Sequence, residues 1–317
     1  MSFAFDPEIG AAMEALAQTF GGTLPTQPPR GDALGLRAFS DPLAAEFMAH
    51  EPKFPEVERR TVPIKSADGT MISGRWFTKS GSAPGSASLF IHGGGTVCGT
   101  VELFDSTTAA YVAATGVPML SVEYRLTPEN PHPKPAEDCY AAFVWLSDHA
   151  SEFGIDPNRI ATMGESAGGL LSAAVALMAR DRGRKLARQI LIYPMLDDRT
   201  QTPDPEMVAF STWTYDNNYT AWRALLAAEP GTRDVHPYAA PAYAKDLRGL
   251  APAYIEVGEL DIFRDEDIEY ARRLSAAAVS VELHVHPGAP HSFEHIAPDS
   301  AVAKRAMADR HRVLRAL

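Results

Sequence analysis

Ser166 is the residue of this sequence whose surroundings point most directly to chemistry. It lies in the run Gly164-Glu165-Ser166-Ala167-Gly168-Gly169, after the short apolar segment 159–163 and before the mostly apolar segment 170–178. A strand that turns sharply into a helix strains the backbone at the turn and leaves almost no room for side chains two positions before and after it. Gly164 and Gly168 meet that need. A serine held in this way projects its hydroxyl into a cleft and can act as a nucleophile.

A second glycine-rich run, His92-Gly93-Gly94-Gly95, follows directly after the apolar segment 88–91. Glycines allow backbone N–H groups to turn toward one point, and a tetrahedral intermediate needs such donors for its negatively charged oxygen. The run lacks the lysine and the serine or threonine that follow in a phosphate-binding loop. We therefore expect the N–H groups of Gly93, Gly94 and Ala167 to form an oxyanion hole.

A serine nucleophile needs a base, and His291 is the candidate that the sequence favours. It lies in the breaker-rich loop 287–293, just after the strand-like segment 281–286. His284 and His286 alternate with apolar residues inside that segment, so both should line one face of the strand instead. Only a loop at the end of the strand leaves an imidazole able to turn toward the serine.

The third member of such a site is an acid that orients the imidazole and stabilises its charged form. In the chain order of serine, acid and histidine, it should follow the apolar segment 253–257. Asp261 lies in the loop itself, whereas Asp265 is expected to begin the next helix, where a carboxylate helps to cap it. Glu259 is the rival, and we favour Asp261.

The elements that must position these residues follow from the order of the apolar runs. A hairpin is expected over 57–66 and 71–79, around Asp68-Gly69. Strand-like runs then alternate with helical segments. Such alternation predicts an α/β fold, with a mostly parallel eight-stranded sheet and helices on both faces. The later runs that we interpret as strands are 87–91, 118–124, 159–163, 189–193, 253–257 and 281–286.

The first fifty residues differ in texture from the rest. Apolar residues recur at spacings of three and four over 7–19, which predicts an amphipathic helix, and a second short helix is expected over 42–50. The aromatic-rich stretch 197–234 breaks the strand-helix rhythm. We expect residues 1–50 to form a small helical cap, with a contribution from 197–234, on a catalytic domain of residues 51–317.

Composition limits the function classes. The chain has 317 residues, 45% of them apolar, and a formal charge of −11, which argues against nucleic acid or an anionic membrane as a partner. No run of 18 apolar residues is present, so no membrane span is expected. The segment 1–10 carries acidic and no basic residues, unlike a secretory signal, and Cys98 and Cys139 give no disulfide framework. We expect a cytoplasmic protein.

Over residues 57–317 the chain resembles the hormone-sensitive-lipase-type branch of the α/β hydrolases, the bacterial family IV esterases. The runs that carry the resemblance are His92 to Gly95, Tyr124 to Glu129, Glu137-Asp138, Asp156 to Ile160, Gly164 to Gly169, Tyr193-Pro194 and Asp261 to Asp265. The resemblance implies Ser166 as nucleophile, Asp261 as acid and His291 as base. It also implies an N-terminal helical cap over the site, hydrolysis of short-chain carboxylic esters and no cofactor, and it suggests a homodimer through the last strand. We expect no metal site.

Several side chains near these motifs are candidates for substrate contact. The elbow carries Glu165 where the family more often has Asp, and that residue either tunes the site or serves as a structural hydrogen-bonding partner. The aromatic residue that often follows the glycine run in the family is replaced here by Thr96, which would open the acyl pocket. The aromatic group of the cap either packs or touches substrate. The candidates are Thr96, Val97, Glu165, Phe210, Trp213 and Phe293.

These expectations lead to a carboxylesterase acting on short- to medium-chain esters through an acyl-enzyme. The nearest alternative is the same machinery acting on amides, formamides or lactones. A different class of alternative is a non-catalytic small-molecule receptor on this fold. Such receptors typically lack the histidine, and His291 is present here.

Overall fold

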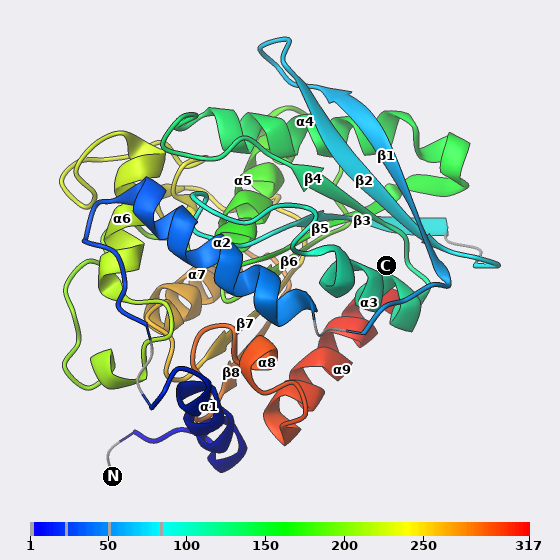
Figure 1. Cartoon of the computed structure of the whole chain (residues 1–317). Coiled ribbons are helices and arrows are strands. Elements are labelled where there is room, and N and C mark those ends of the chain that lie inside the picture. The colour runs from blue at the N-terminus through cyan, green and yellow to red at the C-terminus, as the bar shows by residue number, and fades with distance from the viewer. Residues whose placement is uncertain (1–2, 23–24, 50–51, 83–84) are drawn as a thin grey trace.

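A single eight-stranded sheet forms the centre of the computed structural model, which describes residues 3–22, 25–49, 52–82 and 85–317 (Figure 1). The strand order is β1-β2-β4-β3-β5-β6-β7-β8. β2 runs antiparallel to both of its neighbours, β1 and β4, and all other neighbouring strands are parallel. The predicted α/β class, the mostly parallel sheet and the initial hairpin are confirmed. The strands are β1 (Val57–Lys65), β2 (Met71–Lys79), β3 (Gly85–Ile91), β4 (Met119–Glu123), β5 (Ile155–Glu165), β6 (Arg188–Ile192), β7 (Ala253–Gly258) and β8 (Val281–His286).

Helices cover both faces of the sheet, as predicted. The helices are α1 (Pro7–Thr19), α2 (Ala33–Ala49), α3 (Asp105–Thr115), α4 (Lys134–Asp148), α5 (Ala167–Asp181), α6 (Tyr215–Leu226), α7 (Arg264–Ala276), α8 (Phe293–Ile296) and α9 (Ala301–Arg315). Neighbouring residues of a strand point to opposite faces. On β3, Leu89 and Ile91 pack in the core with α4, α5 and α7, while Phe90 packs in the core with α3 and α9.

The register of the parallel strands places the predicted site residues at one edge. Ile91 pairs with Gly164, so the glycine loop after β3 and the serine elbow after β5 leave the sheet side by side. Gly258 pairs with His286, and the loops that carry Asp261 and His291 therefore also leave together. Ligands of open parallel sheets bind outside the carboxyl ends of the strands, which is where these loops meet.

The N-terminal segment contains two helices that pack on different parts of the molecule. α1 lies against α8, where Ile9 joins a small apolar core with residues of α8 and α9, and α2 lies against α6 (Figure 1). The helix predicted over 7–19 is confirmed. The second helix begins earlier than expected, at Ala33, because Asp32 Oδ1 accepts the Gly35 N–H at 2.8 Å and caps it. Its expected last residue, His50, lies outside the described residues.

No helix in the described part of the chain is both long enough and apolar enough to cross a membrane.

Candidate active site

Ser166 occupies a strained turn between β5 and α5. Its backbone has φ +57° and ψ −117°, a conformation that residues other than glycine rarely adopt. A Cβ at Gly164 would lie 2.2 Å from Gly168 O, and a Cβ at Gly168 would lie 1.9 Å from Ile91 O. Glycine is therefore obligatory at both positions. Strain of this kind persists only where the surrounding structure enforces it, and it concentrates at functional sites.

The structure brings Ser166, His291 and Asp261 into one hydrogen-bonded series. Ser166 Oγ lies 3.0 Å from His291 Nε2, and His291 Nδ1 lies 2.6 Å from Asp261 Oδ2. The other oxygen of Asp261 accepts the Phe263 N–H at 3.0 Å, which fixes the carboxylate. Glu259, the rival acid, instead accepts the Gly288 N–H at 2.9 Å and braces the loop that leads to His291. The geometry can transfer a proton from a serine hydroxyl to an oriented imidazole.

The series is almost closed to solvent. Ser166, Asp261 and His291 are 5%, 1% and 6% exposed. Aromatic rings enclose the imidazole: the ring centroids of Tyr193 and Phe263 lie 4.6 and 5.3 Å from that of His291. The three side chains therefore lie in a largely desolvated setting, where their electrostatic interactions are stronger than in water.

The glycine loop lies directly beside Ser166. A Cβ at Gly93 would be 3.5 Å from Ser166 Cβ, and within the described residues the N–H groups of Gly93 and Gly94 donate to no protein acceptor. Ala167 is the first residue of α5, where N–H groups lack intrahelical partners and the helix dipole favours negative charge. Gly93 and Ala167 thus lie directly beside the serine, and the oxyanion hole of Gly93, Gly94 and Ala167 stays a prediction that this arrangement allows.

His92, at the start of this loop, is a structural residue. Its Nδ1 lies 2.8 Å from Gly93 O, and Tyr124 donates its hydroxyl hydrogen to His92 O at 3.1 Å while stacking on the imidazole ring. Burial lowers the pKa of His92 to about 4, although its hydrogen bond to Gly93 opposes that shift. The imidazole is therefore neutral near pH 7 and holds the loop.

Four of the residues predicted to contact substrate are buried in this arrangement, and their contact with substrate stays a prediction. Thr96, Val97 and Phe293 are 0% exposed and Glu165 is 2% exposed. Thr96 Oγ1 pairs with Thr127 Oγ1 at 3.2 Å, and Phe293 packs in the small apolar core that contains Ile9. A position next to a catalytic motif did not fix the direction of these side chains, because tertiary packing decides it.

The two cap aromatics differ. Trp213 is half-buried and its ring lies between the glycine loop and the candidate base: a Cβ at Gly95 would be 2.8 Å from the indole, and the His291 centroid is 6.4 Å away. Phe210 packs edge-to-face on Phe5 at 5.1 Å, joining the 197–234 stretch to the N-terminal segment. Trp213 thus lies beside both the glycine loop and His291, and Phe210 is engaged in packing.

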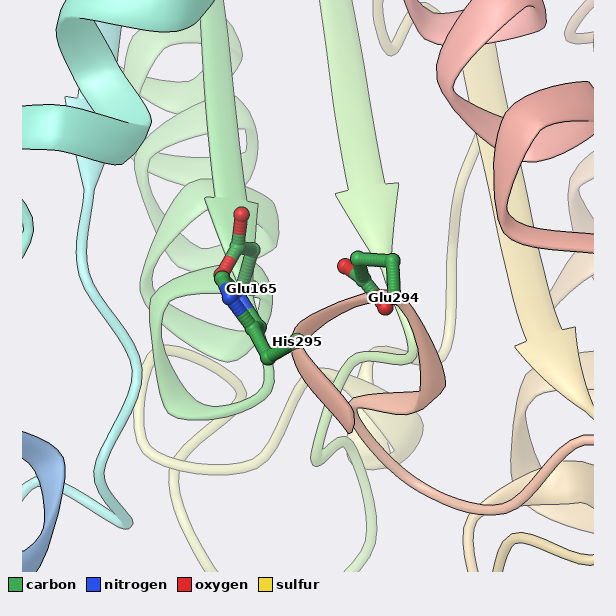
Figure 2. A group of neighbouring side chains, drawn as sticks. All are labelled: Glu165, Glu294 and His295. Atoms are coloured by element: carbon green, nitrogen blue, oxygen red, sulfur yellow. The ribbon is translucent and has the colours of Figure 1, made fainter. Parts of the chain in front are cut away.

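Glu165 begins a buried polar network behind the elbow. It extends from the end of β5 toward His295 of α8, and Glu165 Oε2 lies 3.1 Å from His295 Nε2 (Figure 2). Tyr111 bonds Glu165 at 3.5 Å and receives a hydrogen bond from Arg310 at 2.9 Å. The structural interpretation of Glu165 accounts for these contacts.

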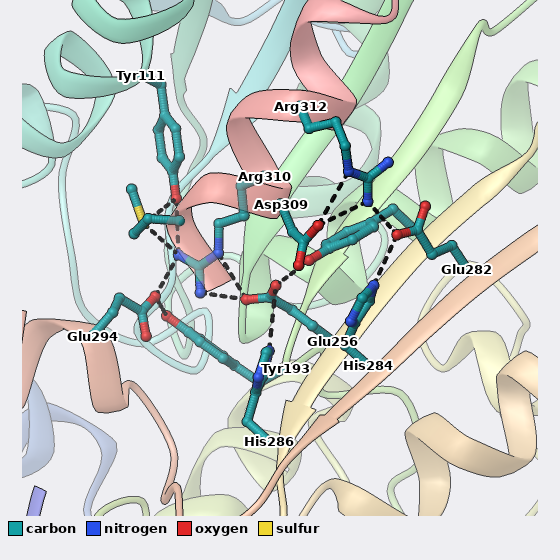
Figure 3. A network of polar contacts seen from close by, with 12 residues as sticks. Tyr111, Tyr193, Glu256, Glu282, His284, His286, Glu294, Asp309, Arg310 and Arg312 are labelled. Atoms are coloured by element: carbon teal, nitrogen blue, oxygen red, sulfur yellow. Dashed lines mark hydrogen bonds and ion pairs between the residues drawn. The ribbon is translucent and has the colours of Figure 1, made fainter. Parts of the chain in front are cut away.

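Arg310 is the centre of that network and is 0% exposed (Figure 3). Its guanidinium pairs with Glu256 at 2.5 Å and with Glu294 at 2.6 Å, and Tyr193 donates to the same Glu294 at 2.7 Å. Burial is the largest single influence and would by itself raise the pKa of Glu294. The charges of Arg310 and His295 and the hydrogen bonds from Arg310 and Tyr193 together outweigh burial and hold that pKa well below its usual range. The ring of Tyr193 contacts His291, and its hydroxyl is held by Glu294, which in turn pairs with Arg310. No local sequence pattern marks Arg310, since its partners come from α3, β7 and α8.

Two groups of described residues have the types and spacing to hold a metal ion. Both already contain a cation of the protein, because Arg310 pairs with Glu294 in one and Arg312 pairs with Glu282 in the other. We assign no metal to either. The groups are Glu165, Glu294 and His295 (Figure 2), and Glu282, His284 and Asp309.

A serine, an imidazole and a carboxylate bonded in series at the carboxyl edge of this sheet, with a glycine loop beside the serine, define the class of α/β hydrolases. The family model for the alpha/beta hydrolase fold matches residues 88–295, and the chain belongs to this family. The resemblance to its hormone-sensitive-lipase-type branch is confirmed.

Known relatives are named as ester hydrolases. "Carboxylic ester hydrolase LipN" of Mycobacterium tuberculosis is 36% identical over 228 residues, which cover 70% of this chain and 61% of that protein. "Ethyl acetate hydrolase" of Pseudomonas putida is 32% identical, covering 66% of each. The match thus spans about 61% of the length of the first curated relative. Among solved structures, "Bacterial Heroin Esterase" has a TM-score of 0.89 at 39% identity and covers 98% of this chain and 97% of its own.

Proposed function

We propose that this protein is a carboxylesterase that uses Ser166 as nucleophile, His291 as base and Asp261 as acid. The observation that carries the proposal is the hydrogen-bonded series from Ser166 Oγ through His291 to Asp261, set beside available N–H groups of the glycine loop. The names of the relatives support ester hydrolysis, and the solved structure named "Bacterial Heroin Esterase" shares the fold over nearly the whole chain.

In the first half of the reaction, Ser166 Oγ attacks the ester carbonyl carbon while His291 Nε2 takes the hydroxyl proton. The carbonyl oxygen becomes an oxyanion and receives hydrogen bonds from Gly93, Gly94 and Ala167. Asp261 stabilises the imidazolium through Nδ1 and does not itself take the proton. The intermediate then expels the alcohol, which leaves with the proton of His291, and the acyl group remains on Ser166.

In the second half, water replaces the alcohol. His291 removes a proton from water as it attacks the acyl carbon, the same N–H groups stabilise the second oxyanion, and His291 returns the proton to Ser166 as the carboxylic acid leaves. No cofactor is needed for either half.

We further propose that the N-terminal helices, residues 1–50, form the cap of this site together with 197–234. Support comes from the contacts between α2 and α6 and from the ring pair of Phe5 and Phe210. Trp213 belongs to this cap and lies near His291, so we assign it to the substrate pocket. Short- to medium-chain acyl groups suit a site that is so nearly enclosed.

The test is hydrolysis of p-nitrophenyl esters from acetate to octanoate, with Ser166→Ala as the matched variant. We expect turnover that is highest among the shorter chains and lost in the variant. Parallel assays with an anilide and a formamide separate esterase from amidase activity. Absence of turnover on every ester, or turnover that survives Ser166→Ala, would overturn the proposal.

A further inference from the structure

Helix α2 of the N-terminal segment holds the glycine loop directly. Arg37 donates from Nε to Val97 O at 2.6 Å and from Nη2 to Thr127 O at 2.7 Å. Asp41, one helical turn further on, accepts the Gly99 N–H at 2.8 Å. Residues four apart lie on the same helical face, so a single face of α2 bonds both sides of the segment that follows Gly95. We call Arg37 and Asp41 the α2 clasp.

The clasped segment is folded tightly back on the proposed oxyanion donors. Val97 and Cys98 both donate to Gly94 O at 2.9 Å. A Cβ at Gly99, whose φ is +91°, would meet His92 Nδ1 at 2.7 Å and Gly93 O at 2.8 Å. The residues that α2 binds are therefore packed directly against the peptides of Gly93 and Gly94, with no room for one to shift without the other.

Arg37 is suited to this position by its planar fork of donors. Besides the two carbonyls it makes a two-pronged ion pair with Glu129, with both N–O distances 2.8 Å. The hydrogen bond from Arg37 lowers the pKa of Glu129, so the pair is charged near neutral pH. A lysine carries one compact ammonium and cannot satisfy four acceptors in this plane.

We propose that the α2 clasp positions the oxyanion loop, so that the site is complete only when α2 is seated on it. Arg37 and Asp41 are then positioning residues: they touch no reacting atom and act through the N–H groups of Gly93 and Gly94. The inference rests on the proposed esterase function. With α2 seated, the bonds of Arg37 and Asp41 hold the segment that packs on the peptides of Gly93 and Gly94. The cap thereby becomes a condition for turnover as well as a cover.

The experiment compares Arg37→Ala with the wild type in kcat and KM for p-nitrophenyl butyrate and in the affinity for a trifluoromethyl ketone. This ketone adds to the serine and places an oxyanion in the hole. Removal of one oxyanion donor costs about 10²–10³ in kcat, and misplacement should cost less. We expect kcat to fall roughly 10- to 100-fold, KM to change less than about 3-fold and ketone affinity to fall in parallel with kcat/KM. Guanidinium added to Arg37→Ala should restore part of its kcat. Arg37→Lys should not reach the kcat of the wild type.

Arg30→Ala is the matched control. Arg30 also ties the N-terminal segment to α6, through Asp216 at 3.3 Å and the ring of Tyr219, but it does not touch the glycine loop. It should keep kcat and ketone affinity near wild type. If Arg37→Ala does not fold, Asp41→Ala, which removes one bond of the clasp, carries the same test.

Three results would contradict the clasp: folded Arg37→Ala with wild-type kcat, a loss confined to KM with unchanged ketone affinity, or an equal loss in Arg30→Ala. These differ from failure of the proposed function, in which the wild type itself shows no Ser166-dependent ester turnover.

Discussion

Both nitrogens of the His291 imidazole are hydrogen-bonded, so its two partners, Asp261 and Ser166, have different roles. Asp261 fixes Nδ1, so Nε2 faces Ser166 as a proton acceptor. The serine elbow, the glycine loop and the His291 loop could all be predicted from sequence, because glycine spacing and breaker residues leave a local signature. The choice between Asp261 and Glu259 depended on loop placement alone, and the structure places only Asp261 against the imidazole.

The first residue-scale prediction separates the two acids. Asp261→Asn should lower kcat by about 10³–10⁴-fold, because an amide leaves the imidazole in the wrong tautomer and cannot stabilise its charge. Glu259→Gln keeps an oxygen that can accept from Gly288 and should stay within about 10-fold of wild type. Steady-state kinetics on p-nitrophenyl butyrate measures both. Larger damage in Glu259→Gln than in Asp261→Asn would show that the acid is misassigned.

The second concerns Trp213, the predicted contact that stays near His291. Trp213→Ala removes the indole that lies next to Gly95. The kcat/KM for the preferred short ester should therefore fall about 10-fold or more, and the kcat/KM for esters of bulky acids should rise relative to that for acetate. Phe210→Ala is the control and should leave the chain-length profile unchanged. An unaltered profile in Trp213→Ala would remove this residue from the pocket.

At the scale of elements, strands were easier to predict than the attachments of the cap. The buried strands have strong apolar runs between residues that break regular structure. α2 instead contains Pro42, and its Leu36 is buried (1% exposed) only because of contacts made in the folded protein. A proline inside a helix argues against that helix locally. Arg37 and Asp41 contact residues about sixty to ninety positions away in the sequence, so no local sequence pattern predicts these contacts.

The strand-turn-helix element at Ser166 makes a steric prediction. Gly164→Ala should destabilise the fold by at least about 3 kcal/mol and abolish activity, because the new Cβ meets the backbone oxygen of Gly168 at 2.2 Å. Gly10→Ala in α1 is the matched control: its Cβ would lie 3.6 Å from Phe5 Cβ, so stability should hold or rise by about 0.5–1 kcal/mol. Denaturant unfolding measures both, and a stable, active Gly164→Ala would refute the turn.

At the scale of the whole molecule, the Arg310 network ties α9 to the sheet and to the loop of His291. It joins residues from α3, β7, α8 and the turn after β6 (Figure 3). Such a network cannot be foreseen from sequence, since an arginine in a helix is exposed far more often than it is buried. Its partners become neighbours only when the sheet forms.

This network predicts how stability depends on pH. Arg310→Met leaves buried carboxylates without their cation and should cost about 3–5 kcal/mol at pH 7. The pKa of Glu294 is lowered in the fold from an ordinary 4.5, so the stabilisation from Arg310 is present above about pH 4.5 and is lost as the pH falls further. In the variant the buried carboxyl has lost its cation, so burial raises its pKa in the fold and it takes up a proton already above about pH 4.5. The deficit of the variant should therefore narrow between pH 7 and pH 4.

Urea unfolding of wild type and Arg310→Met at the two pH values measures that change. Arg305→Met, an exposed position on the same helix, serves as the control and should stay within about 0.5 kcal/mol of wild type at both. A deficit that is equal at pH 7 and pH 4 would mean that Arg310 acts through packing and not through its charge.

The most direct test of the central claim is to label the enzyme with paraoxon and locate the adduct by peptide mass spectrometry while ester hydrolysis is followed. An activated serine at this elbow should take one diethylphosphoryl group per chain, on Ser166, with activity lost in proportion to labelling. An adduct on another residue, or full activity in protein labelled at Ser166, would contradict the account.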